Sequence, residues 1–286
     1  MEASLATEWP FEPLVLAGCL LALALFFQGF FRLRRRGRTD HAGWGRAALF
    51  VGAVALTYLA LASPLAVAAD DLLSAHMLEH LLLGDLAVAL AMLAIRGPLV
   101  FFLLPPPVLA PLARSPRLRA FLRWLTGPWV ALAVWTASMW IWHIPRFYDY
   151  AAAHEVVHEL EHLTFFLGGV LIWNLLIDPA RTGRLTVPGR IALAIAVFML
   201  GDFVMAAILN GAFTYPLYAD QADRLLGLSP RADRQAAALL MLAEQTLTLG
   251  ICVGVLVLQY VKADRGPEHE TVRYSPLAHG TTKGEK

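Results

Sequence analysis

Seven long apolar runs constrain this chain more than any other feature of its sequence. An α-helix needs about 20 apolar residues to cross a bilayer, and lipid offers no partner to an unpaired backbone N–H or C=O group. Because the runs are continuous rather than alternating, we predict an all-α polytopic membrane protein, a seven-transmembrane-helix bundle. Only 16% of the residues are charged, against about 25% in soluble domains. The predicted spans cover about residues 13–31, 44–62, 72–95, 128–144, 157–177, 190–211 and 236–260.

The basic residues predict the orientation of these spans. With the N-terminus outside and the C-terminus in the cytoplasm, 19 of the 23 Lys and Arg residues fall in cytoplasmic segments, among them RLRRRGR at 32–38. Cytoplasmic loops are enriched in Lys and Arg, which favours this orientation. We therefore expect a seven-span domain over residues 1–261 that is in contact with membrane lipid. The polar segment 262–286 is predicted to be a disordered cytoplasmic tail.

One further apolar segment, PLVFFLLPPPVLAPLA at 98–113, is short and contains five prolines. Proline breaks helices, so we predict an interfacial or re-entrant piece here rather than an eighth span. An eighth span would also place the later loops on the wrong sides and largely remove the charge asymmetry.

Cysteine content and net charge exclude two further features. Cys19 and Cys252 fall near opposite faces of the predicted membrane domain, too far apart for a disulfide. A net charge of +1 argues against a nucleic-acid partner.

Six histidines gather in the outer third of the predicted membrane domain, although Arg and Lys alone set its orientation. The motif H-x-L-E-H-L occurs twice, as HMLEHL at 76–81 and HELEHL at 158–163. Residues four apart share one face of a helix, so each motif presents two imidazoles side by side. Buried ionisable groups in a membrane mark functional sites, and histidine is the commonest metal ligand. We predict a metal site formed by His76, His80, His143, His154, His158 and His162.

Within this site, the expected core is His158 and His162 opposite His76 and His80 at matched depth. His143 closes the site from the fourth span, and His154 lies at the interface, where it meets the incoming ion. Taken singly, His143 and His154 are equally well explained as helix–helix hydrogen-bond partners.

The metal is predicted to be copper, with zinc as the alternative. Imidazole with thioether suits copper, and Met77, Met139, Met205 and Met241 fall in the outer halves of their spans, although each alone is explained by packing. Imidazole with carboxylate suits zinc equally well. Groups expected to support the ligands are Glu79, Glu161, Asp202, Met77 and Met241.

Other acidic residues have less certain places in this scheme. Regular helical spacing puts Asp85 on the face opposite His76, where we expect an interior contact, while Asp202 and Glu244 stay open. The outer loop at 210–235 carries Asp220, Asp223 and Asp233, which either cap the site, receive a partner or are simply solvated.

Four segments of the chain resemble the CtaG family of cytochrome c oxidase assembly factors, in its polytopic form. They are SAHMLEHLLL (74–83), WHIPRFYD (142–149), HELEHLTFFLGGVLIW (158–173) and DRQAAALLM (233–241). The resemblance covers about 45–260 and implies a seven-span protein of the bacterial plasma membrane that is needed to form active haem-copper oxidase and handles copper. It implies oxidase subunits or an outer-side copper donor as partners, and it places the family's histidines on the same six positions. The chain departs from the family at Glu79, where Gln is expected, and at Leu242, where Trp is expected.

Two other functions remain open from the sequence. H-x-x-E-H is also the arrangement of a zinc hydrolase, with Glu79 or Glu161 as general base, but a catalytic site needs only one copy. A haem-binding electron carrier would use histidines as axial ligands beside Gly168 and Gly169. An assembly factor or metal chaperone is preferred to an enzyme.

Overall fold

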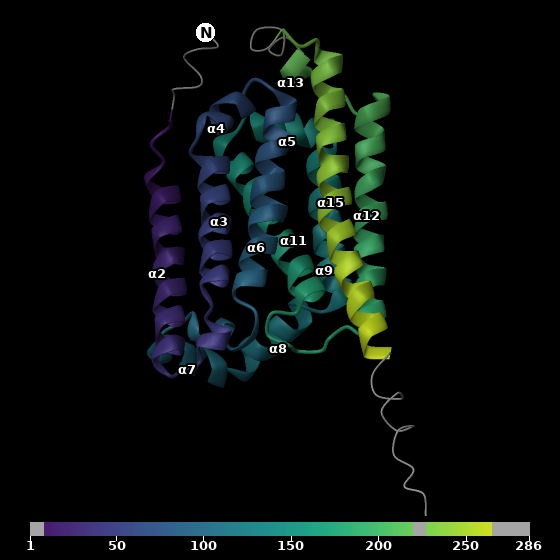
Figure 1. The fold of residues 1–286 in the computed structure, drawn as a ribbon. Helices are drawn as coiled ribbons and strands as arrows, with labels where there is room; N and C mark the ends of the chain where they lie inside the picture. The colour runs from purple at the N-terminus through teal and green to yellow at the C-terminus, as the bar shows by residue number, and fades with distance from the viewer. Residues whose placement is uncertain (1–8, 220–226, 265–286) are drawn as a thin grey trace, which may run out of the picture.

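The computed structural model describes residues 9–219 and 227–264, and every regular element in these residues is a helix. Figure 1 shows long helices that run in alternating directions, with short helices at both ends of the bundle. The predicted all-α class is therefore confirmed. The predicted tail from residue 265 onward, and Asp220 and Asp223 of the outer loop, lie outside the described residues.

Among the described residues, six helical segments are long and apolar enough to cross a membrane. A seventh predicted span is helix α9 (Pro128–His143), whose 16 residues are about 24 Å long and fall short of that length. The count of seven crossings thus stays a prediction. The six segments are built from α2 (Pro13–Arg35), α3 (Trp44–Leu61), the rod α5–η2–α6 (Leu73–Ala94), α11 (Glu155–Ile177), α12 (Val187–Asn210) and α15 (Pro230–Asp264).

The rod α5–η2–α6 and helix α11 lie at the centre of the packing. The α5 end of the rod contacts α15, its η2 and α6 parts contact α11 and α3, and α11 also packs against α9. Helix α12 packs against α15, and α2 lies outermost against α3 (Figure 1). The two helices that carry the H-x-L-E-H-L motifs therefore each pack against several neighbours, although α11 keeps one face exposed, with Val156, Leu160, Leu163 and Leu167.

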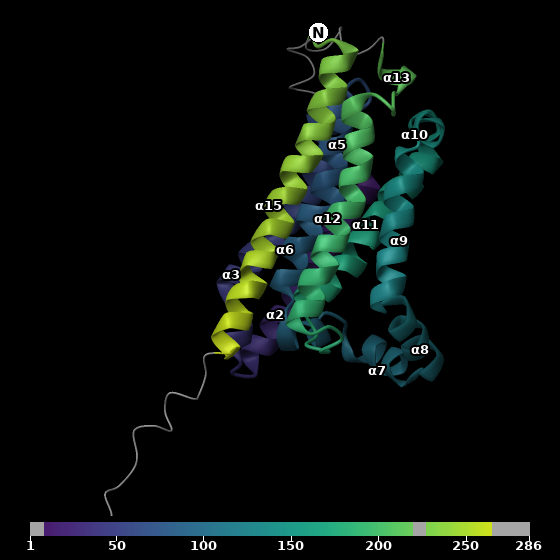
Figure 2. The same ribbon diagram turned by 90° about the vertical axis from the view of Figure 1, so that its right-hand side faces the viewer.

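Short helices close the two ends of the bundle. At one end lie α4 (Pro64–Ala69), α10 (Pro145–Ala152) and α13 (Pro216–Ala219), and at the other α7 (Pro106–Arg114) and α8 (Pro116–Leu125) (Figures 1 and 2). Eight of the described helices begin at a proline, because its fixed φ suits the first turn and its missing N–H has no partner there anyway. Segment 98–113 forms η3 (Gly97–Phe102) and α7, and neither is long enough to span.

One π-helical turn, η2 (Leu82–Leu86), joins α5 (Leu73–Leu81) to α6 (Ala87–Ala94). The wider turn rotates the residues that follow it, so Asp85 is not on the face remote from the histidines, as regular spacing predicted. Instead it lines the same cavity as Met77 and His80. π-turns of this kind are frequent at functional sites.

The π turn lies unusually close to α11. A Cβ atom added to Gly169 would stand only 1.8 Å from the backbone oxygen of Gly84. Only glycine therefore permits this approach, which sets the distance between the two histidine-bearing helices.

Candidate metal centre

The two H-x3-H pairs face each other across the contact between α5 and α11. Both helices begin at the same end of the bundle, so the pairs meet at the same depth. The ring centroids of His76 and His158 are 5.0 Å apart, and those of His80 and His162 are also 5.0 Å apart. Along each helix the rings are separated by 4.4 and 4.3 Å. The structure thus places four imidazoles at the corners of a near-rectangle, as the repeated motif predicts.

The glutamates of the two motifs pair crosswise with histidines of the opposite helix. Glu79 Oε1 lies 3.6 Å from Nε2 of His162, and Glu161 Oε1 lies 3.9 Å from Nδ1 of His80. These separations exceed those of good hydrogen bonds. They resemble the spacing of two ligands on one ion, about 3.3–4.4 Å when each bond is about 2.0–2.2 Å long.

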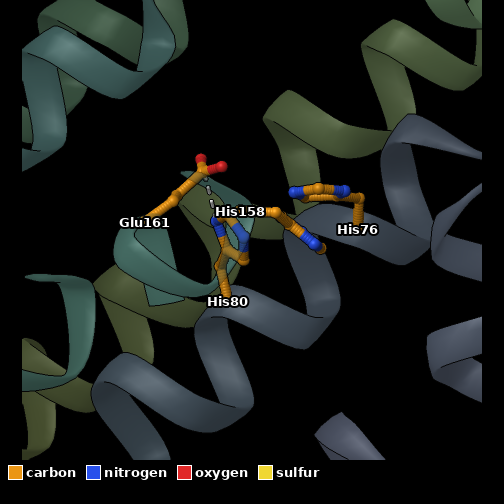
Figure 3. A group of neighbouring side chains, drawn as sticks. All are labelled: His76, His80, His158 and Glu161. Atoms are coloured by element: carbon orange, nitrogen blue, oxygen red, sulfur yellow. Dashed lines mark ion pairs between the residues drawn. The ribbon is translucent and has the colours of Figure 1, made fainter. Parts of the chain in front are cut away.

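Four of these side chains offer ligand atoms that all lie within 4.8 Å of one another: His76, His80, His158 and Glu161. We call these four residues the histidine cluster. Figure 3 shows the three rings and the carboxylate converging from α5 and α11, with the ion pair between His80 and Glu161 dashed. His158 is half-buried and the other three are buried, so His158 marks the accessible side of the cluster.

The histidine cluster leaves several buried polar atoms without a hydrogen-bond partner among the described residues. They include Nε2 of all three histidines and both carboxylate oxygens of Glu161. Unpaired buried polar atoms are rare and costly in folded proteins. Imidazole nitrogens and carboxylate oxygens in this arrangement are the donors that copper or zinc would use, so the residues present fit a bound metal ion.

A tyrosine hydroxyl contacts Nδ1 of His76. The oxygen of Tyr218 lies 3.2 Å from the backbone oxygen of Ala69 and 3.0 Å from Nδ1 of His76. When the hydroxyl donates to Ala69, Nδ1–H of His76 donates to the tyrosine oxygen, and the Nε2 lone pair is then free. Burial raises the pKa of Tyr218, so the phenol stays neutral. Nothing in the local sequence around Tyr218 pointed to His76, which lies 142 positions away.

His143 is buried at the end of α9, beside the histidine cluster rather than within it. Its Nδ1–H donates to the backbone oxygen of Met139 at 2.6 Å, which leaves Nε2 free and without a described partner. The ring of Phe165 lies 4.7 Å from His80 and 5.9 Å from His143. His143 and His80 both line a cavity of about 70 Å³ on the inner side of the cluster.

Two predicted residues stand apart from the histidine cluster. His154 is exposed at the start of α11, where its ring stacks on Tyr150 at 4.0 Å and its Nδ1–H donates to that residue's backbone oxygen. Asp202 is half-buried on α12 and lines neither the cluster nor the described cavity beside it.

The remaining candidates line the cavity. Met77 and Met241 are buried in its wall. Asp85 forms the interior contact predicted for it, accepting hydrogen bonds from Nε1 of Trp173 and from Oγ1 of Thr248, the latter at 3.2 Å. Glu244, whose place the sequence left open, also lines the cavity, so the lining holds two acidic groups.

Asp233 anchors the helix that carries His76 and His80. It was predicted in a loop above the site, but α15 begins earlier than expected and holds Asp233 buried in its first turn. Its carboxylate accepts hydrogen bonds from the backbone N–H groups of Leu73 and Ser74, at 2.8 and 3.0 Å. The N-cap position of α5 is Leu72, which has no side-chain acceptor, so an aspartate from a distant helix replaces the missing cap.

Replacing Asp233 by alanine is expected to lower the free energy of unfolding by about 1–3 kcal/mol, because two N–H groups at the start of α5 lose a charged acceptor. Thermal unfolding of the purified protein in detergent measures the effect. Glu155→Ala is a matched control, because Glu155 is an acidic residue in the first turn of α11 whose side chain is exposed. Equal melting temperatures for the two variants would show that the cap does not stabilise α5.

Comparison with known proteins identifies the family. The sequence profile described as cytochrome c oxidase caa3 assembly factor (Caa3_CtaG) matches residues 24–263. Uncharacterized proteins of Mycobacterium bovis and Mycobacterium tuberculosis are each 29% identical over 276 residues, which cover 92% of this chain but only 41% of each relative. No solved structure matches the chain. Since the profile covers most of the sequence, including every histidine of the cluster, the chain belongs to the cytochrome c oxidase caa3 assembly factor family.

Proposed function

We propose that this protein binds copper as cargo in the histidine cluster and assists the copper loading of cytochrome c oxidase. The observation that carries the proposal is the set of unpartnered Nε2 atoms on His76, His80 and His158, facing a buried carboxylate. Family membership supports the oxidase as the recipient. The partners on this proposal are oxidase subunits and an outer-side copper donor.

The residues around the histidine cluster would perform two tasks in holding the ion. Glu79 and Glu161 are buried next to histidines of the opposite helix and offset the positive charge of a metal ion. Tyr218 keeps Nε2 of His76 available by holding its Nδ1–H. When bound, copper supplies the cargo for the oxidase, and the chain needs no catalytic base of its own.

The cargo role also requires that the histidine cluster lies near the outer face of a plasma membrane. We propose seven crossings, with α9 as a short span, the N-terminus outside and the C-terminus in the cytoplasm. The distribution of Lys and Arg supports this topology.

A reporter that is active only in the cytoplasm tests this topology. It is expected to work when fused after Arg36 or Lys262 and to fail when fused after Ala219. Activity after Ala219 would place the histidine cluster on the cytoplasmic side and contradict an outer-side copper donor.

A zinc hydrolase is less well supported by the geometry. Glu79 and Glu161 are both buried and each faces a histidine of the opposite helix, whereas a general base stands next to a water-accessible metal position. Hydrolase activity that survives the double variant Glu79→Gln/Glu161→Gln would exclude this function, because a hydrolase would lose all activity without a base.

A haem protein is also less well supported. The cavity beside the histidines measures about 70 Å³, whereas pockets for larger organic ligands measure about 300–1,000 Å³. The two glycines expected beside a porphyrin pack against other helices instead, since Gly169 meets Gly84 and Gly168 meets Trp135. A Soret band in the purified protein would reverse this conclusion.

Metal analysis of the purified protein, together with a deletion strain, tests the proposed function. We expect copper in the wild-type protein and its loss from the variant His76→Ala/His80→Ala. The deletion strain should have lower oxidase activity and less copper in the oxidase, with unchanged haem synthesis. Zinc in place of copper, or normal oxidase copper in the deletion strain, would overturn the proposal.

A further inference from the structure

Four helices contribute methionines to the cavity on the inner side of the histidine cluster. Met77 lies on α5, Met139 on α9, Met205 on α12 and Met241 on α15, and all four line the cavity. They also belong to one packed group of side chains, in which three of them are at most 3% exposed. The sequence singled out these four because they share the outer half of the membrane domain, and the fold brings them to one place.

Two imidazoles also line the cavity. His80 belongs to both the histidine cluster and the cavity, and His143 reaches the cavity from α9. Nε2 of each is buried and has no hydrogen-bond partner among the described residues. In His143 the other nitrogen already donates to a backbone oxygen, so a lone pair remains on Nε2. A purely apolar packing arrangement does not account for these two nitrogens.

The charge and size of the cavity indicate what kind of ion it takes. Thioether sulfur and imidazole nitrogen are soft ligands that favour Cu(I) over Zn(II), and neither described cysteine lines the cavity. Asp85 and Glu244 also line the cavity and offer a counter-charge. A volume of about 70 Å³ holds an ion, since one water molecule needs about 10–15 Å³ by the same measure.

We propose that this methionine-lined cavity is a second metal site, specific for a soft monovalent ion such as Cu(I), which shares His80 with the histidine cluster. This inference rests on the proposed function, because the cavity would be a second binding position for the same copper cargo. His158 marks the accessible side of the cluster and His80 its inner side, so copper passes from the cluster to the methionines by exchange of ligands on His80, without a change of oxidation state.

Metal binding by the full chain in detergent tests this second site, with Ag(I) as a redox-inert monovalent probe and with Cu(I) under reducing conditions. The wild-type protein is expected to bind two ions. Met205→Leu/Met241→Leu, which conserves side-chain volume, should bind one. The matched control Met92→Leu/Met199→Leu changes two methionines outside the cavity and should still bind two.

A second pair of variants separates this proposal from the proposed function. His76→Ala/His158→Ala removes ligands of the cluster that do not line the cavity, and should leave one ion. If the methionine variant binds as many ions as the wild type, the methionines serve packing alone and the second site is wrong. If the His76→Ala/His158→Ala variant binds as many ions as the wild type while the methionine variant binds fewer, the histidine cluster is not a metal site. The proposed function then fails, and the second site stands.

Selenomethionine gives a measurement that needs no substitution. With all seven methionines replaced by selenomethionine, X-ray absorption at the selenium edge should show a bonded Cu or Ag neighbour in the loaded protein. Absence of such a neighbour at saturating metal would overturn the second site, even if the methionine variants unfold.

Discussion

His80→Ala is expected to lower the affinity of the purified protein for copper by more than about 100-fold. Loss of a group that merely supports a ligand costs about 10–100-fold, and loss of the ligand itself should cost more. His80 has the largest expected effect because it faces Glu161 in the histidine cluster and also lines the methionine cavity. Copper titration against a competing chelator measures the affinity, and oxidase activity in the complemented deletion strain measures the consequence.

The control for this experiment is the exposed histidine at the start of α11. His154 stacks on Tyr150 outside the histidine cluster, and water can replace its contacts, so His154→Ala should be much milder. Alanine at His76, His158 or His162 should also lower the affinity strongly, because each belongs to the facing pairs, but less than at His80, because none of these three lines the methionine cavity. Equal severity at His154 would mean that copper binds nearer the surface than the histidine cluster.

Gly169→Ala is expected to have the second largest effect. Its new methyl group would stand 1.8 Å from the backbone oxygen of Gly84, and a backbone atom cannot move aside as the end of a flexible side chain can. Overpacking of this kind costs about 1–3 kcal/mol or more and would push η2 away from α11. Because the facing histidines depend on that approach, copper binding should fall together with the melting temperature.

The neighbouring glycine provides the matched control. A Cβ atom on Gly168 would meet Trp135 at 3.5 Å, which is an ordinary contact, so Gly168→Ala should keep both stability and copper. The two variants differ only in which neighbour the methyl group meets. If both retain copper equally, the close approach of the π turn to α11 does not set the geometry of the histidine cluster.

The sequence by itself determined the helices and the pairing of the histidines. Continuous apolar runs cannot expose backbone groups to lipid, so their length and spacing predicted helices close to the observed bounds. The repeated H-x-L-E-H-L motif predicted two imidazole pairs because residues four apart share a helix face. Both predictions depend only on the spacing of residues within one segment, so the sequence of that segment is enough to make them.

Tertiary structure alone decided how distant groups complete the site. The π turn brings Asp85 to the cavity, whereas regular helical spacing placed it on the opposite face. No pattern in the local sequence predicted that this turn would contain one more residue than an α-helical turn. Tyr218 contacts His76 at a sequence separation of 142 residues, and Asp233 contacts Leu73 at a separation of 160. No local motif can therefore predict either contact. The crosswise pairing of Glu79 and Glu161 likewise required the distance between two helices. That distance is set by one glycine meeting a backbone oxygen, a packing constraint that becomes visible only when the two chain segments are brought together.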